Sequence, residues 1–256
     1  MDKFITAKKS IKIKYIAVIL MIILHLFLKP PRDYISIFSI NGINIEYIIT
    51  KFCNICVGIF VFLSGYGLTR KYGENINYKI IGKKIFKFYI NYWYIFLTFI
   101  PLGLIMKKIE YDPIRLILNF FAIISNYNYE WWFVILYVQL LIVFPIFNNI
   151  LNKKSSKKQH LVIYIISLVV SIVGMVIYKL YMGNILINIF LPLFMYQFVF
   201  ITGMIIVKDG IYSKISEKFV IKNKKIEVLL FILIMVFMNI TGCIPVVGKI
   251  VNPIMI

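Results

Sequence analysis

The side chain with the clearest chemical potential in this sequence is a histidine inside an apolar run. His25 is the one readily ionised residue of YIAVILMIILHLFL, the run from Tyr15 to Leu28. An ionisable group in such a run is costly where it meets lipid, so it marks a candidate functional site. Imidazole groups in general change charge near neutral pH, which suits them to proton transfer. His25 is therefore the candidate catalytic residue.

A second basic residue precedes this histidine at a spacing that matters. Lys14 stands 11 residues before His25, which in a helix is about 16 Å along the axis and close to three turns. The two side chains therefore share one helix face. With Lys14 at the mouth of a ~30 Å hydrocarbon layer, His25 lies near or slightly beyond its middle. This geometry suits a ligand that enters from the Lys14 side and extends its reactive end toward His25.

The composition indicates that a membrane surrounds these residues. The chain is 61% hydrophobic and 15% charged, whereas soluble domains are about 45–50% apolar and about 25% charged. We expect an all-α fold, a polytopic bundle of transmembrane helices that forms one membrane-embedded domain over residues 1–256. Each expected span approaches the ~20 residues that cross a bilayer. The spans are Tyr15–Leu28, Phe52–Thr69, Phe88–Met106, Trp131–Leu151, Leu161–Tyr178, Ile185–Val207 and Val228–Ile244.

The basic residues indicate how the bundle is oriented. The net charge is +19, and a cytoplasmic N-terminus places 21 of the 29 Lys and Arg residues on the cytoplasmic side. That bias is the positive-inside pattern, so it explains the charge through membrane lipids and without a nucleic-acid partner. We expect a multi-pass protein of the plasma membrane with its N-terminus in the cytoplasm.

One apolar segment is too short to be a span. Ile114–Ser125 has 12 residues, fewer than a helix needs to cross the hydrocarbon layer. Treating it as a span would also move the lysines of KKSSKK to the outer side, against the positive-inside pattern. We predict an interfacial or re-entrant helix on the outer side.

The remaining candidate ligands and nucleophiles carry little chemistry. Cys53 and Cys56 form a C-x-x-C pair without further metal ligands nearby, so we expect small packing residues and no metal. His160 follows KKSSKK, where we expect a solvated interfacial histidine. The sequence contains no Gly-rich phosphate loop and no G-x-S-x-G nucleophile motif.

Several stretches carry motif-like patterns in order. Lys14 and His25 form a basic-residue-x10-histidine pattern at the first expected span. VFLSGYGL (Val61–Leu68) is an aromatic-rich block in the second span, and KKIFKFYINYW (Lys83–Trp93) leads into the third. WFVILYVQLLIVFP (Trp132–Pro145) lies in the fourth span and ends in proline. Together these stretches resemble the helix motifs of the acyltransferase 3 family, integral-membrane enzymes that acylate cell-surface and secreted polysaccharides.

The chain departs from the family pattern in two motif positions and in length. Lys84 and Lys87 stand where the family has arginines, and Ile90 and Asn91 where it has a proline. Lysine keeps the charge but lacks the planar fork of arginine, a loss that phosphate binding tolerates. The family bundle also has more than seven spans, so we expect a chain that lacks the last of them.

The resemblance implies roles for the residues singled out above. The donor substrate would be acetyl-CoA or another acyl-CoA, with its phosphates held by Lys14, Lys84 and Lys87. The acceptor would be a hydroxyl of a cell-surface carbohydrate. His25 would act either as the base that deprotonates this hydroxyl or as a transient acyl carrier. The expected cavity-lining residues are Ser64, Tyr66 and Trp132.

Each of these roles has a simpler structural alternative. His25 could be hydrogen-bonded to a neighbouring helix, and Lys84 and Lys87 could contact anionic lipid head groups. Ser64 and Gly65 fit close helix packing, which we slightly prefer for them. For the whole chain, the alternatives are a polysaccharide flippase or polymerase-like bundle, or an inactive truncated relative. A single intramembrane titratable group and the lack of an internal repeat favour an enzyme over a transporter.

Overall fold

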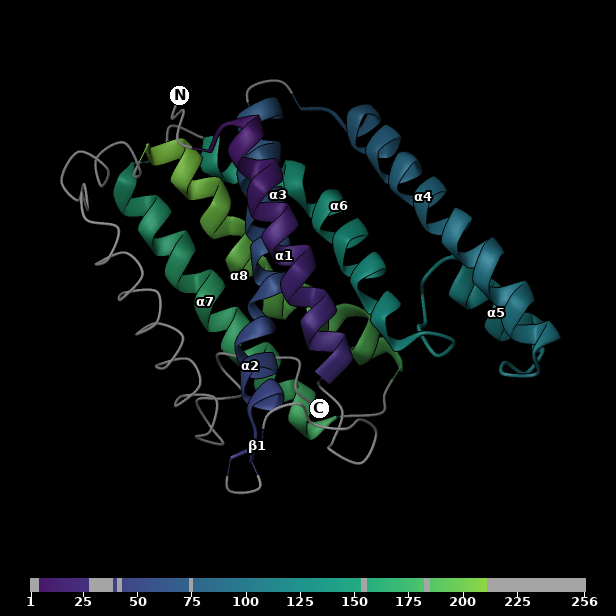
Figure 1. Ribbon diagram of the computed structural model, residues 1–256. Coiled ribbons are helices and arrows are strands. Elements are labelled where there is room, and N and C mark those ends of the chain that lie inside the picture. The colour runs from purple at the N-terminus through teal and green to yellow at the C-terminus, as the bar shows by residue number, and fades with distance from the viewer. Residues whose placement is uncertain are drawn as a thin grey trace. The chain divides into compact units, whose positions relative to one another are not determined.

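The computed structural model describes residues 5–27, 39–40, 43–73, 76–152, 156–181 and 185–210, and these form a predominantly helical fold (Figure 1). One short β pairing accompanies the helices, with Ser39 opposite Asn44 and Ile40 opposite Ile43. The elements are α1 (Ala7–Phe27), β1 (Ser39–Ile40), β2 (Ile43–Asn44), α2 (Ile45–Cys53), α3 (Ile55–Tyr72), α4 (Tyr78–Ile105), α5 (Pro113–Phe120), η1 (Tyr129–Trp131), α6 (Trp132–Asn152), α7 (Lys157–Leu180) and α8 (Ile185–Asp209).

Six helical stretches of the described residues are long and apolar enough to cross a membrane. They correspond to the first six predicted spans, so the predicted polytopic bundle is confirmed. The seventh predicted span, Val228–Ile244, lies outside the described residues. The six stretches are Ala7–Phe27, Ile49–Tyr72, Tyr78–Ile105, Tyr129–Asn152, Lys157–Ile177 and Ile187–Asp209.

Several helices begin earlier than the apolar runs that predicted them. Helix α1 begins at Ala7 and not at Tyr15, and α4 begins at Tyr78 and not at Phe88. The reason is that lysine is a good helix former, so the helix continues through the basic segment beside each apolar run. The start of α4 is set by a capping residue, since the Asn77 side chain accepts a hydrogen bond from the Ile80 N–H at 3.0 Å.

The helices form two compact units. The first unit comprises the described parts of residues 1–70 and 199–256. In it, α1 packs Ala17 and Leu24 against Cys53 and Cys56. Both cysteines are buried and neither forms a disulfide, as expected of packing residues.

Two glycines bring the backbones of α3 and α8 into contact within the first unit. A Cβ atom added to Gly65 would collide with the Phe200 carbonyl oxygen. A Cβ atom added to Gly203 would lie 2.8 Å from the Tyr66 backbone nitrogen. Small residues permit such close approach between membrane helices, where packing replaces the hydrophobic effect. The close-packing interpretation of Gly65 is therefore confirmed.

The second unit comprises the described parts of residues 71–198. Here α7 and the first half of α8 are joined by buried polar side chains, because membrane helices must satisfy such groups internally. The Gln197 side chain donates to the Ser167 carbonyl at 2.6 Å, and the Ser171 hydroxyl donates to the Met195 carbonyl. Helix α7 begins in a capping box between Ser156 and Gln159.

The contact between α3 and α8 predicts a sharp difference between two glycine substitutions. Gly65→Ala should lower the midpoint of thermal unfolding in detergent by at least about 4 °C, because the new methyl group overpacks the contact with Phe200. Gly67→Ala is the matched control, since nothing lies within 4 Å of its Cβ position. Equal midpoints for the two variants would contradict the backbone contact.

Candidate active site

The predicted catalytic histidine and its basic partner lie on α1 of the first unit. Lys14 and His25 are both exposed, and their separation of 11 residues places them on one face of the continuous helix Ala7–Phe27. This face adjoins the buried one that carries Ala17 and Leu24. Both side chains are thus accessible to a ligand along α1.

The predicted cavity-lining residues of α3 lie at a different level from His25. Tyr66 is buried, and its hydroxyl accepts a hydrogen bond from the Ile5 N–H at 3.1 Å. The cluster around Tyr66 also contacts Ile13, which precedes His25 by 12 residues, or about 18 Å along the helix. Tyr66 and the half-buried Ser64 are therefore closer to the Lys14 end of α1 than to the His25 end.

The N-terminal segment is fastened to α3 by two side chains. Besides the bond between Tyr66 and Ile5, the Arg70 guanidinium donates to the Ile5 carbonyl. Both backbone groups of Ile5 are thereby satisfied just before α1 begins. The geometry gives Tyr66 a structural role in this unit.

The predicted donor-binding lysines of α4 differ in their surroundings. Lys84 is half-buried, and its Nζ lies 4.9 Å from the centre of the Tyr72 ring, within cation–π range. Lys87 is exposed. Both belong to the second unit, at the end where α4 begins.

Trp132 is the first residue of α6 in the same unit. Its ring is half-buried and lies 5.8 Å, centre to centre, from the ring of Tyr196 on α8. The adjacent Trp131 packs against Tyr92 and Phe96 of α4. Lys84 precedes these two contact points by 8 and 12 residues, or about 12 and 18 Å. Trp132 and the lysines thus belong to different levels of the second unit.

The short segment after α4 folds back along that helix. Three side chains of α4 donate hydrogen bonds to three consecutive carbonyls at the end of α5. Tyr92 donates to Asn119 at 2.5 Å, Trp93 to Phe120 at 3.0 Å, and Tyr89 to Phe121 at 2.9 Å. The last carbonyls of a helix have no partners within it, so these donors satisfy the end of α5.

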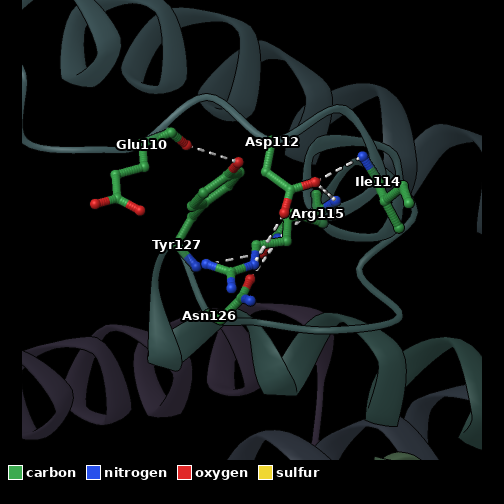
Figure 2. Close-up of polar contacts among 7 residues, drawn as sticks. Glu110, Asp112, Ile114, Arg115, Asn126 and Tyr127 are labelled. Carbon is green, nitrogen blue, oxygen red and sulfur yellow. Dashed lines mark hydrogen bonds and ion pairs between the residues drawn. The ribbon is translucent and has the colours of Figure 1, made fainter.

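Asn119 organises the turn that follows α5. Its side chain is fully buried, and its Nδ2 donates to the Arg115 carbonyl at 2.7 Å and to Asn126 Oδ1 at 2.6 Å. Figure 2 shows the surrounding network, in which the Tyr127 hydroxyl donates to the Glu110 carbonyl at 3.3 Å. The Asp112 carboxylate caps α5 and pairs with Arg115 at 3.2 Å.

The position along α4 of the contact with α5 helps to decide whether the predicted short helix is interfacial or re-entrant. Tyr89 and Trp93 precede the last residue of α4, Ile105, by 16 and 12 residues, or about 24 and 18 Å along the helix. The intervening residues Leu97 and Phe99 are apolar and exposed, as lipid-facing side chains are. The geometry therefore favours a re-entrant segment over a helix on the membrane surface. The helix covers Pro113–Phe120, shorter than the predicted Ile114–Ser125.

The prediction that His160 is a solvated interfacial histidine is wrong. His160 is only 5% exposed, and its Nε2 lies 3.1 Å from the Leu151 carbonyl oxygen. Because a carbonyl oxygen only accepts, Nε2 is the donor in this contact. Flanking lysines do not keep a neighbouring side chain in solvent, and here the imidazole lies against the end of α6.

A comparison with known protein families identifies the family of the chain. The model of the family Acyl_transf_3, described as an acyltransferase domain, matches residues 12–253. The chain belongs to the acyltransferase 3 family. Comparisons with curated proteins and with solved structures find no match. Together with the apolar helices, family membership makes the chain a multi-pass membrane acyltransferase.

In this member of the acyltransferase 3 family, the block Lys83–Trp93 has a structural part that sequence reasoning missed. The basic residues of the block were expected to bind the donor, but its aromatic residues hold the end of α5. The available signal was their spacing, since residues 89, 92 and 93 share one helix face. Three aromatic hydrogen-bond donors on one face of a membrane helix indicate carbonyl partners nearby.

The α4 contact predicts different outcomes for two neighbouring tyrosines of this acyltransferase. Tyr92→Phe removes the bond to Asn119, whose carbonyl keeps the Ala122 N–H at 2.8 Å. The expected cost is about 1 kcal/mol, or about 2–4 °C in the unfolding midpoint in detergent.

Tyr94→Phe is the matched control, because Tyr94 is 71% exposed on the same helix. It should leave the unfolding midpoint unchanged. If Tyr94→Phe lowers the midpoint as much as Tyr92→Phe, the hydrogen bond to Asn119 is not the cause.

Proposed function

We propose that this acyltransferase moves an acetyl group from acetyl-CoA to a hydroxyl of a cell-surface carbohydrate, in the plasma membrane and with its N-terminus in the cytoplasm. The observation that carries the proposal is the pair Lys14 and His25, exposed on one face of α1 within a chain of this family. Lys14, Lys84 and Lys87 contribute positive charge for the phosphates of the donor.

The proposed reaction uses His25 in one of two ways. As a base, its imidazole takes the proton of the sugar hydroxyl while the oxygen attacks the thioester carbonyl carbon, and the carbon–sulfur bond breaks to release the thiolate. As an acyl carrier, the imidazole nitrogen attacks first, releases the thiolate, and then passes the acetyl group to the hydroxyl. Both routes require a neutral imidazole at the start and end with an ester and free coenzyme A.

The expected level of the reaction follows from the α1 spacing. A donor whose phosphates contact Lys14 must extend its reactive end about 16 Å along the helix to meet His25. The pantetheine arm of coenzyme A is a long, flexible chain that ends in sulfur, which suits this separation. The exposure of both side chains supports the proposal, because a donor that lies along α1 can reach them.

His25→Ala should abolish acetylation. In cells that express the chain, the O-acetyl content of surface polysaccharide should fall at least about 100-fold toward that of cells without it, as loss of a general base predicts. Ile22→Ala, an exposed position on the same helix, should keep full activity at equal membrane abundance.

Three outcomes of this experiment contradict parts of the proposal. Acetylation that persists in His25→Ala removes the histidine from the mechanism. Acetylation that is equal with and without the chain contradicts acetyl transfer to that polysaccharide. Movement of unmodified polysaccharide across the membrane, dependent on the chain, would instead support a transporting bundle.

The proposed donor contacts predict a change in KM. Lys14→Gln and Lys87→Gln should each raise the KM for acetyl-CoA about tenfold, the usual loss for one charged contact, with little change in kcat. Lys108→Gln is the control, since Lys108 is exposed just after α4 ends and is expected on the outer side. An equal increase for Lys108→Gln would indicate a general electrostatic effect and no specific contact.

A further inference from the structure

Two lysine ammonium groups meet at one tyrosine in the second unit. Lys71 Nζ lies 5.2 Å and Lys84 Nζ lies 4.9 Å from the centre of the Tyr72 ring. Lys71 and Tyr72 end α3, whereas Lys84 comes from the second turn of α4. The family resemblance implied a role for Lys84 but none for Lys71 or Tyr72.

Neighbouring contacts hold this tyrosine in place. The carbonyl of Gly73, the residue directly after Tyr72, accepts hydrogen bonds from the side-chain amides of Asn148 at 3.1 Å and Asn152 at 2.8 Å. Asn148 is 1% exposed, so this anchoring belongs to the core of the unit. These hydrogen bonds fix the end of α3 to α6, and they hold the backbone that carries the Tyr72 phenol.

Lys84 is also distinguished from the other lysines of its helix. It is half-buried, whereas Lys83 and Lys87 are exposed. A lysine ammonium group has a lower free energy in water and away from a second positive charge. Its position over Tyr72 therefore concentrates two positive charges and one hydroxyl donor at a single point.

A doubly charged anion with several acceptor oxygens complements this arrangement. A phosphate monoester carries about −1.5 to −2 charges near neutral pH and three acceptor oxygens. A phosphodiester or each inner phosphate of a diphosphate diester carries a single charge. Lysine ammonium groups bind phosphate as point charges, and a tyrosine hydroxyl adds a directed hydrogen bond.

We infer that Lys71, Tyr72 and Lys84 form a binding site for a phosphate monoester, the group that distinguishes coenzyme A from dephospho-coenzyme A. The inference rests on the proposed function, because the acyl donor supplies the phosphate. In this site Lys71 and Lys84 neutralise the dianion, and Tyr72 both positions the two ammonium groups and donates to an oxygen. The site selects donors that carry a terminal phosphate.

The test compares the affinities of coenzyme A and dephospho-coenzyme A for the purified full chain in detergent. Wild type should bind coenzyme A at least about tenfold more tightly. Lys71→Gln and Lys84→Gln should each remove most of that ratio by weakening coenzyme A alone. Tyr72→Phe should reduce the ratio partly, because it keeps the ring and loses the hydroxyl. Lys83→Gln, the exposed neighbour of Lys84, should leave the ratio unchanged.

The outcomes separate this inference from the proposed function. If wild type binds both nucleotides equally, or if Lys83→Gln lowers the ratio as much as Lys84→Gln, the monoester site is wrong while an acyl-CoA donor stands. If neither nucleotide binds, both the donor and the inference are wrong.

A lipid could supply the same chemical group. Displacement of bound coenzyme A by phosphatidic acid in mixed micelles, but not by phosphatidylcholine, would place a lipid monoester in the site and overturn the assignment to the donor. Absence of competition by phosphatidic acid supports the donor as the source.

Discussion

The second unit depends on the satisfaction of the backbone carbonyls at the end of α5. Hydrocarbon offers no hydrogen bonds, so a helix that ends within it must find donors from the protein. Tyr89, Tyr92 and Trp93 supply three donors from one face of α4 to carbonyls 119–121. The aromatic rings of the same residues pack around Phe96, Phe120 and Trp131, so one helix face satisfies the polar groups and fills the apolar space.

The first unit is held together by close packing of helix backbones. Its α3 and α8 backbones touch at Gly65 and Gly203, where no side chain intervenes. Lys14 and His25 are exposed on α1, on the same side as Met21, which is partly buried against the core of this unit. Different residues of α1 thus meet the core and carry the proposed chemistry.

Hydrophobic runs and basic residues were sufficient to predict the six described spans and the short helix after α4, and the resemblance of several motifs indicated the family. They could not predict where helices begin, because lysines such as those before Tyr15 extend a helix beyond its apolar run. They also failed for His160, whose burial depends on the Leu151 carbonyl of another helix. The pairing of Tyr72 with Lys84 joins two helices across a connection, and such contacts carry no periodic signal in the sequence.

The fold-back of residues 110–131 also orders events during synthesis. The donors on α4 leave the ribosome before the carbonyls that they bind, and α6 follows both. On the predicted orientation, the segment is delivered to the outer side and then enters beside an α4 that already spans the bilayer. Its placement is consequently a step that the order of the spans does not enforce. A chain in which these contacts fail to form would cross the membrane the correct number of times and still be misfolded. An assay that reports orientation alone would not detect this misfolding.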